Sequence, residues 1–443
     1  MDEAARFFRH GALAGSVARV LPLRAVRFDP ENVDLGRVLA PPYDVIGADD
    51  QARLYADDLR NIVRIDYGQV LPDDRPGSDD RYTRAAGHLR SWMDLGILVR
   101  DPRPAYYVSS HRVPGVDDGE RTRVGIFARI PARPWDEAEI RPHERTLRAP
   151  KADRLALMRA TGMQTSPVFA LWDRAPGLDR VLEAVTAAPP AATGRSRGEL
   201  GREHHQLWVA DDPDEVTAIS AALSAAHLYV ADGHHRYETA AAFAEERRAV
   251  EPEAPPDADF ALALVYLCAA ADPAAEVLPT HRLVRPGDGV PSTVAELGSR
   301  LDGGLRLEAR PDLAAAAADM RALRPTHHAF AILGHDGAAL LSTERRPTAS
   351  PRDSLDVVVL QDQVLIPACG LDPERIDGGA LGYTRDPNEA EQAIASGAAA
   401  IALLCNSAST AEIIAVADAH EVMPQKSTYF YPKVPTGLVL SPL

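Results

Sequence analysis

Cysteines and long apolar runs are scarce in this chain of 443 residues. Its three cysteines, Cys268, Cys369 and Cys405, include no Cys-x-x-Cys pair. This argues against a disulfide scaffold and a zinc cluster, and it fits a reducing compartment. No apolar run reaches about 18 residues, so we expect no membrane span. The first residues, MDEAARFFRHGALAG, start acidic and lack a long apolar core, which argues against a signal peptide. The sequence therefore predicts a cytoplasmic protein.

Several motifs of common enzyme classes are also missing. The chain has no Gly-x-x-x-x-Gly-Lys-[Ser/Thr] and no Gly-x-Gly-x-x-Gly after a strand, which argues against a P-loop NTPase and a Rossmann dinucleotide site. It has no Gly-x-Ser-x-Gly elbow and no protein-kinase signature set, which argues against an α/β-hydrolase and a protein kinase.

The charge balance is acidic. The chain has 48 Lys and Arg against 64 Asp and Glu, a formal net charge of −16. A generic duplex-DNA binder needs a basic face, so this balance argues against one. It leaves room for a local basic pocket that holds a phosphorylated small molecule. The sequence does not specify the oligomeric state, and a homo-oligomer is one of the options.

The composition is that of a globular protein, with 46% hydrophobic and 25% charged residues. The length suggests two to four domains. We expect three consecutive regions, 1–130, 131–290 and 291–443, and a mixed α/β fold class because strand-like runs alternate with helical patterns. The expected helices lie near 80–95, after 231 and at 410–419, the strands at 106–110, 123–130, 168–172, 228–231, 261–268, 329–333 and 399–404, and the breaks at 71–80, 188–203 and 249–259.

The most informative segment is HLYVADGHHRYETA at 227–240. An apolar strand leads into Asp232 and Gly233, and a helix is expected to begin directly after them. Such a helix N-terminus binds anions through its unpaired N–H groups and its dipole. His234, His235 and Arg236 would add donors, and Asp232 could cap the helix or hold Mg²⁺. The alternative is an ordinary helix start followed by solvated polar residues.

Adjacent histidines occur at 204–205, 234–235 and 327–328. Neighbouring residues of a strand point to opposite faces, so these pairs are poor chelators. No His-Glu-x-x-His motif occurs. These patterns argue against a catalytic zinc site held by histidines.

A second segment, 140–171, places Glu144 between His143 and Arg145 in a basic stretch. A carboxylate among cations stays ionised and suits a general base or an ion holder. The alternative is a surface network of salt bridges. The basic stretch also includes Arg141, Arg148, Lys151 and Arg154.

Three shorter segments complete the candidate residues. Each has a structural alternative as a packed or rigid segment. Two prolines precede the candidates at 43 and 44. A predicted strand precedes those at 281 and 282, and prolines fix the backbone of the segment 421–440. The segments are 39–46 with Tyr43 and Asp44, 278–284 with His281 and Arg282, and 421–440 with Lys426, Ser427, Thr428 and Lys433, whose lysines could reach a phosphate or a carboxylate.

These segments together resemble the signature blocks of DUF1015, a bacterial and archaeal family without an established activity. The resemblance runs through nearly the whole chain, in order. Its blocks are APPYDVI, NIVRIDYG, RPHERTL, LYVADGHHRYETA, LPTHRLV and MPQKSTYFYPKVPTGLV.

The Asp-Gly-His-His-Arg turn is also similar to the phosphate-binding motif of the ParB/sulfiredoxin-like fold, and above all to that of free serine kinases. This resemblance implies a ParB/sulfiredoxin-like core over 131–290, flanked by α/β regions. It implies ATP, ADP or another nucleotide as ligand and Mg²⁺ as cofactor. Taking this resemblance together with the candidate segments above, we assign catalysis to Glu144, Asp232 and His234, phosphate binding to Gly233, His235, Arg236 and Arg145, Mg²⁺ to Asp232, and substrate binding to His143, His281, Arg282, Lys426, Ser427, Thr428, Tyr43 and Asp44.

The leading functional hypothesis is therefore a phosphotransferase acting on free serine or a related hydroxyl metabolite. Glu144 would take the hydroxyl proton. The alternatives are a phosphoserine phosphatase, and a nucleotide-binding regulator without metabolic turnover. A protein associated with nucleic acid is a third possibility, against which the net charge argues.

Overall fold

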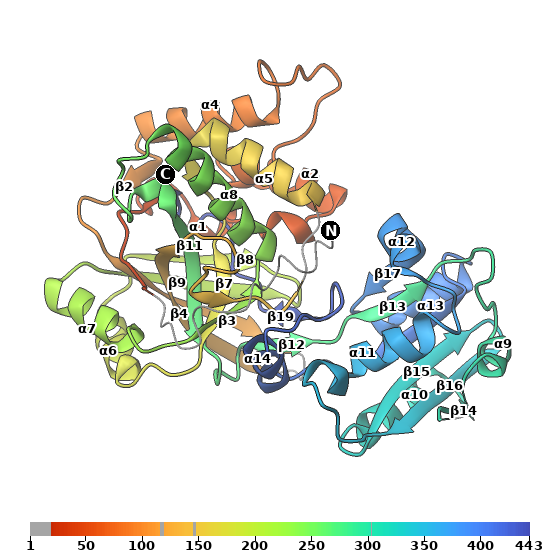
Figure 1. The fold of residues 1–443 in the computed structure, drawn as a ribbon. Coiled ribbons are helices and arrows are strands. Elements are labelled where there is room, and N and C mark those ends of the chain that lie inside the picture. The colour runs from red at the N-terminus through yellow and green to blue at the C-terminus, as the bar shows by residue number, and fades with distance from the viewer. Residues whose placement is uncertain (1–18, 116–118, 145–147, 303) are drawn as a thin grey trace. The chain divides into compact units, whose positions relative to one another are not determined.

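The computed structural model describes residues 19–115, 119–144, 148–302 and 304–443 (Figure 1). The chain divides into two compact units. The first comprises residues 1–142, 146–276 and 432–443, and the second comprises 143–145 and 277–431. The second unit is thus largely an insertion in the sequence of the first.

The first unit is built on an eight-stranded mixed sheet in the order β5-β10-β7-β11-β4-β3-β9-β8. The pairs β5–β10 and β7–β11 are parallel, and the other neighbours are antiparallel. Central strands such as β7 consist of buried residues only, as their continuous apolar sequences lead one to expect. The strands are β3 (Tyr106–Pro114), β4 (Glu120–Pro131), β5 (Ile140–Arg141), β7 (Val168–Trp172), β8 (Ala192–Arg197), β9 (Arg202–Ala210), β10 (Leu228–Asp232) and β11 (Leu262–Ala269).

Two groups of helices cover this sheet. Helices α4 (Arg81–Asp94), α5 (Arg148–Thr161) and α8 (His234–Val250) pack side by side, and α8 lies on β7 and β11 (Figure 1). Helices α6 (Leu178–Thr186) and α7 (Pro213–Leu223) pack together, and α6 lies on β3 and β9. The α4 N-terminus is fixed by a capping box between Asp80 and Thr83.

Short elements complete the first unit. The C-terminal residues return to it, because β20 pairs with β6 and Leu440 and Thr436 form bridges with Val26 and Ala40. The elements are β1 (Val26–Phe28), β2 (Leu98–Arg100), β6 (Met163–Gln164), β20 (Ser441–Pro442), α1 (Leu35–Val38), α2 (Ala48–Asp57) and α3 (Val63–Asp66).

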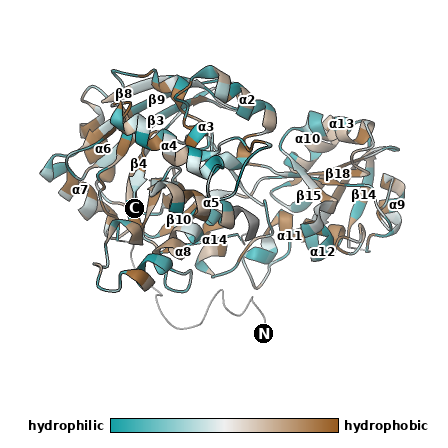
Figure 2. Ribbon diagram, turned by 90° about the horizontal axis from the view of Figure 1, so that it is seen from above, coloured by the Kyte–Doolittle hydropathy of each residue, from teal (hydrophilic) through white to brown (hydrophobic). Residues whose placement is uncertain are grey.

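The second unit has a six-stranded antiparallel sheet in the order β14-β16-β15-β18-β13-β17. Its core is an apolar cluster from α10, α13, β15 and β18. Figure 2 shows the contrast between the hydrophobic strand β18 and the hydrophilic edge strand β14. The main elements are β13 (His281–Val284), β14 (Arg306–Arg310), β15 (His327–Gly334), β16 (Gly337–Glu344), β17 (Leu381–Thr384), β18 (Ile401–Cys405), β19 (Tyr429–Tyr431), α9 (Val294–Ser299), α10 (Leu313–Leu323), α11 (Asp356–Leu360), α12 (Pro373–Arg375), α13 (Pro387–Ala395) and α14 (Thr410–Asp418), with β12 (Glu276–Leu278) at the boundary of the first unit.

The structure confirms the mixed α/β fold class and the predicted helices and strands. Two expectations differ from it. The polar break at 188–203 contains the edge strand β8, whose exposure hides the apolar signal of a strand. Instead of three consecutive regions there are two units, because β3 and β4, which lie almost entirely within 1–130, pair into one sheet with β7 to β11 from the region 131–290. In the described part of the chain, no helix is both long and apolar enough to cross a membrane.

Candidate functional site

The Asp-Gly-His-His-Arg segment forms the turn between β10 and α8. Strand β10 ends at Asp232, and Gly233 takes a left-handed conformation with φ of 89° as the N-cap of α8. A Cβ at Gly233 would lie 2.8 Å from Arg236 Nε. Glycine is therefore required here both by the backbone and by the packing of Arg236. No side chain caps α8, so Asp232 does not have the capping role that was one of its two expected functions.

Two cations bind the Asp232 carboxylate. Lys433 Nζ lies 3.0 Å from Oδ1, and the Arg236 guanidinium donates to Oδ2 and to the carbonyl oxygen of Pro167. Burial opposes ionisation of Asp232, but Lys433 and Arg236 outweigh it and hold the pKa of Asp232 far below its usual range. Asp232 is therefore a carboxylate at neutral pH. From the sequence, Lys433 was expected to reach a phosphate or a carboxylate. In the structure it lies beside the turn and binds Asp232.

Tyr43 and Asp44 belong to the same electrostatic environment. They lie in a short 3-10 helix, Tyr43–Val45, and the guanidinium of Arg154 lies 4.2 Å from the centre of the Tyr43 ring. Burial, followed by the charge of Asp44, raises the pKa of Tyr43. Burial lowers the pKa of Arg236, but the nearby charges of Asp232 and Asp44 outweigh this effect, so the pKa of Arg236 is raised. The fold thus brings these two predicted residues to the turn.

The two histidines of the turn differ in environment. His234 is buried, and its ring centre lies 6.4 Å from that of Trp135. His235 is partly buried, and burial lowers its pKa although Glu238 and Asp44 oppose the shift. His235 is therefore mainly neutral near pH 7, so it can accept a proton or a hydrogen bond.

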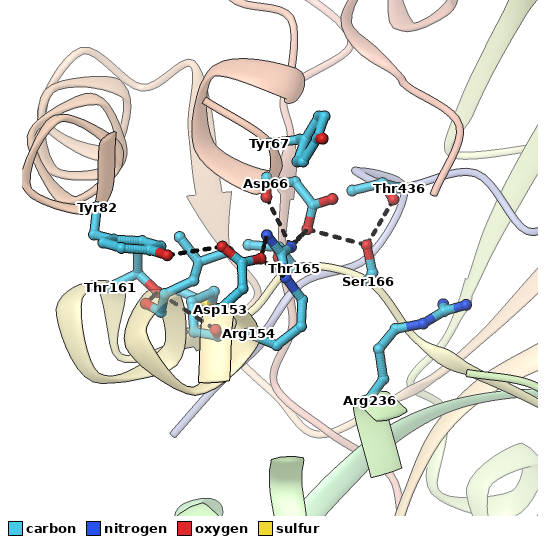
Figure 3. Close-up of polar contacts among 12 residues, drawn as sticks. Asp66, Tyr67, Tyr82, Asp153, Arg154, Thr161, Thr165, Ser166, Arg236 and Thr436 are labelled. Carbon is cyan, nitrogen blue, oxygen red and sulfur yellow. Dashed lines mark hydrogen bonds and ion pairs between the residues drawn. The ribbon is translucent and has the colours of Figure 1, made fainter. Parts of the chain in front are cut away.

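Asp66 centres a polar cluster that the sequence analysis did not single out (Figure 3). Its Oδ1 accepts hydrogen bonds from Thr165 Oγ1 at 2.6 Å and Ser166 Oγ at 3.1 Å. Arg154 donates to the backbone oxygen of Asp66 at 2.7 Å. Asp66 Oδ2 is buried and has no hydrogen-bond partner. In the sequence, the one signal for Asp66 was its place in the block NIVRIDYG. Its contacts join positions far apart in the chain, and such contacts leave no local pattern.

In the second unit, Glu144 lies against the segment 423–428. Its Oε1 accepts the backbone N–H of Lys426 at 2.5 Å, and Met423 forms a parallel bridge with it. His143 Nε2 lies 2.9 Å from Thr428 Oγ1, and Ser427 Oγ donates to the Pro424 oxygen at 2.6 Å. The structure therefore brings Glu144 and His143 together with the predicted Lys426, Ser427 and Thr428.

His281 and Arg282 lie on β13 of the same unit and face different partners. His281 is 4% exposed and accepts the Cys405 N–H at Nδ1, with an N···N distance of 3.3 Å. The Arg282 guanidinium lies 5.6 Å from the Tyr383 ring centre. Burial raises the pKa of Tyr383, Arg282 lowers it and Glu144 raises it. Arg282 thus lies against the Tyr383 ring, whereas His281 is engaged with the sheet backbone.

The predicted residues thus form two groups, one in each unit. Asp232 to Arg236, Tyr43, Asp44 and Lys433 lie in the first unit, whereas His143, Glu144, His281, Arg282, Lys426, Ser427 and Thr428 lie in the second. Arg145 lies outside the described residues. Joint action of the two groups stays a prediction.

The first unit is thus of a mixed α/β class, in which a strand, a glycine turn and a helix lie beside the charged side chains of Asp232, Arg236 and Lys433. The chain matches the family described as "Protein of unknown function (DUF1015)" over residues 20–358 and belongs to it. The resemblance inferred from the sequence blocks is confirmed for the family. The comparison with curated proteins gives no match.

Solved structures show weaker likenesses. A free serine kinase in complex with AMP has 15% identity and a TM-score of 0.35, over 68% of this chain and 89% of that chain. A conserved hypothetical protein from Pyrococcus furiosus has 13% identity and a TM-score of 0.35, over 68% and 92%. SbnI from Staphylococcus aureus has 11% identity and a TM-score of 0.34, over 71% and 87%. TM-scores of this size do not establish a common fold, so the ParB/sulfiredoxin-like core stays a prediction.

Proposed function

We propose that the protein is a small-molecule phosphotransferase that moves a phosphoryl group between a nucleotide and the hydroxyl of free serine or a related metabolite. The observation that carries the proposal is the β10–α8 turn. An α-helix of 17 residues begins there at a left-handed glycine without a side-chain cap, beside Lys433 and Arg236. Helix N–H groups, a lysine and an arginine together suit the phosphates of a nucleotide.

The charges at the turn suggest how a phosphate would bind. Lys433 and Arg236 neutralise Asp232 in the free protein. An incoming phosphate offers a second anion to the same two cations, and Lys433, with its long flexible side chain, is the donor best able to turn towards it. Arg236 is held by two partners and is buried, so we assign it mainly to shaping the turn.

Magnesium fits this donor set only together with a nucleotide. Mg²⁺ prefers oxygen ligands and is bound in such enzymes by one or two carboxylates plus substrate phosphates. Asp232 and Asp44 would supply the carboxylates. When bound, the ion would neutralise charge on the transferred phosphoryl group.

Glu144 is the proposed general base, a role that comes from the resemblance to free serine kinases. The substrate hydroxyl oxygen would form a bond to the γ-phosphorus of ATP. The bond from that phosphorus to the β,γ-bridging oxygen would break, its electron pair would leave with ADP, and the hydroxyl proton would pass to Glu144. Such proton transfer contributes about 10²–10⁴-fold to the rate.

Phosphorus NMR of the full chain with Mg²⁺, ATP and L-serine tests the proposal, in parallel with a sample of O-phosphoserine alone. Phosphoserine that forms only when serine is present supports the kinase reaction. Phosphate released from phosphoserine alone would show that the protein is a phosphoserine phosphatase and not a kinase. If neither sample reacts while nucleotide still binds, the proposal is wrong and the protein is a nucleotide-binding regulator.

Two variants separate binding from chemistry. Glu144→Gln should bind nucleotide normally and lose turnover by the factor expected of a general base. Lys433→Gln should bind nucleotide about tenfold more weakly or worse, because a charged hydrogen bond to phosphate is lost. Arg159→Ala is the matched control, since it removes a cation from an exposed pair with Glu246 on the same unit. If Lys433→Gln binds nucleotide with unchanged affinity, the turn does not bind its phosphates.

A further inference from the structure

Three neighbouring strands of the first unit carry ionisable side chains in one row. His111 on β3 is the direct cross-strand partner of Arg123 on β4 and of His205 on β9. Direct partners in a sheet project from the same face. Glu203 lies two residues before His205 and therefore shares that face. None of these residues belongs to the candidate groups described above.

Three side chains of this row, His111, Glu203 and His205, bring polar atoms close to one another. His111 Nε2 lies 2.9 Å from Glu203 Oε2, and His205 Nε2 lies 3.8 Å from the same oxygen. One ligand atom of each residue lies within 4.8 Å of the others. Ser196 Oγ on β8 lies 2.7 Å from His205 Nε2. Ligand atoms of a tetrahedral zinc ion are about 3–3.5 Å apart, given metal–ligand distances near 2 Å.

We propose that His111, Glu203 and His205 bind a divalent transition-metal ion, with Zn²⁺ as the best match. Two imidazole nitrogens and one carboxylate oxygen are a ligand set typical of zinc, and Ser196 Oγ or a water would complete the tetrahedron. Because the ligands come from β3 and β9, and Ser196 from β8, the ion would hold three adjacent strands together.

The surroundings favour this assignment. Both histidines are buried, and the Nδ1 atom of each has no hydrogen-bond partner. The Glu203 side chain keeps 12% of its surface exposed, which leaves a route for an ion. A Cβ at Gly198 would lie 1.7 Å from Glu203 Oε1, so the carboxylate occupies space that only a glycine leaves open.

Arg123 is the charge that would oppose a cation here. Its guanidinium lies over aromatic rings of β7 and β11, 4.7 Å from the ring centre of Phe169 and 5.1 Å from that of Tyr266. It also donates to the backbone oxygen of Pro432. The aromatic faces and the carbonyl stabilise the guanidinium there, although Arg123 stays the direct cross-strand partner of His111.

The test is metal binding by the full chain after removal of metals with a chelator. Cobalt(II) chloride is titrated while visible absorption is recorded, and zinc sulfate then competes for the site. We expect one Co²⁺ per chain with the intense absorption of a tetrahedral site, displacement by Zn²⁺, and a melting temperature that rises with Zn²⁺.

The control variant lies next to a ligand. His204→Ala removes the neighbouring imidazole, which faces the other side of β9 and contacts Arg112, and it should bind metal as the wild type does. Glu203→Gln and His205→Gln should lose affinity at least about tenfold. Circular dichroism establishes that each variant is folded. If the folded wild type binds no Co²⁺, or if His204→Ala loses as much as Glu203→Gln, the row is a hydrogen-bonded cluster without metal and the proposal is wrong.

Discussion

Gly233 is the residue on which the geometry of the candidate turn depends most directly. Its φ of 89° is costly for any other residue, and a Cβ would also press on Arg236. We predict that Gly233→Ala lowers the free energy of unfolding by about 1–3 kcal/mol and also weakens nucleotide binding. Denaturant unfolding and nucleotide titration measure the two effects.

Gly96→Ala is the matched control for this substitution. Gly96 also has a positive φ, 67°, but a Cβ there would meet nothing within 4 Å. It should lose stability through backbone strain and keep its affinity for nucleotide. Equal losses of affinity in both variants would contradict a specific role of the turn.

His281 predicts a dependence of stability on pH. Burial, together with Arg282, lowers its pKa to about 4, and Asp386 opposes the shift. Below about pH 6.5 the unfolded chain takes up a proton that the folded chain refuses. The free energy of unfolding should therefore fall as the pH drops from 6.5 to 4, by about 3 kcal/mol from this residue.

His281→Asn isolates this effect, because the Asn oxygen can accept the Cys405 N–H in place of Nδ1. Unfolding at several pH values is compared between wild type and variant. The difference between their free energies should shrink or reverse towards pH 4. A difference that stays constant over this range would show that His281 does not titrate as inferred.

Among the elements, the contact between α1 and β8 is unusually close. A Cβ at Gly36 would lie 2.0 Å from the backbone oxygen of Arg195, and one at Gly194 would lie 2.6 Å from Gly36 N. Backbone atoms cannot move aside as a flexible side chain can. Gly36→Ala should therefore separate α1 from β8 and cost about 1–3 kcal/mol, as overpacking does.

Gly87→Ala is the control for Gly36→Ala, and thermal unfolding compares both variants with the wild type. Gly87 lies inside α4, and a Cβ there meets nothing within 4 Å. Alanine should stabilise that helix by about 0.5–1 kcal/mol. A destabilisation by Gly36→Ala no larger than that of exposed substitutions would mean that the two elements do not pack this tightly.

Elements with strong local patterns could be predicted from the sequence. Helix α4 and strands β7, β10, β11 and β18 follow from apolar periodicity and from Gly96 as a stop signal. Strand β8 could not, because its alternating exposed residues resemble a loop. The cluster of His111, Glu203 and His205 was missed for a related reason, because the cross-strand pairing of His111 with His205 is set by register and not by adjacent positions in the sequence.

At the scale of the whole molecule, the last residues of the chain complete the first unit. Residues 432–443 supply Lys433 to Asp232, Thr436 to Ser166 and strand β20 to β6. We predict that a chain ending at residue 431 unfolds at a lower temperature than the full chain. A chain of full length with residues 432–443 in scrambled order should behave like the truncated one, which differential scanning calorimetry can check. An unchanged melting temperature in both would contradict this role.

The sequence by itself determined the local chemistry of this protein. The family blocks, the apolar strands and the strand, glycine and helix at Asp232 to Arg236 are written in consecutive residues, where periodicity and backbone preference act. Only the tertiary structure decided which distant residues meet: Lys433 with Asp232, Ser166 and Thr165 with Asp66, and His111 with Glu203 and His205. The reason is physical, since sheet order and register are set by the burial of whole faces, and no local pattern specifies which strands become neighbours.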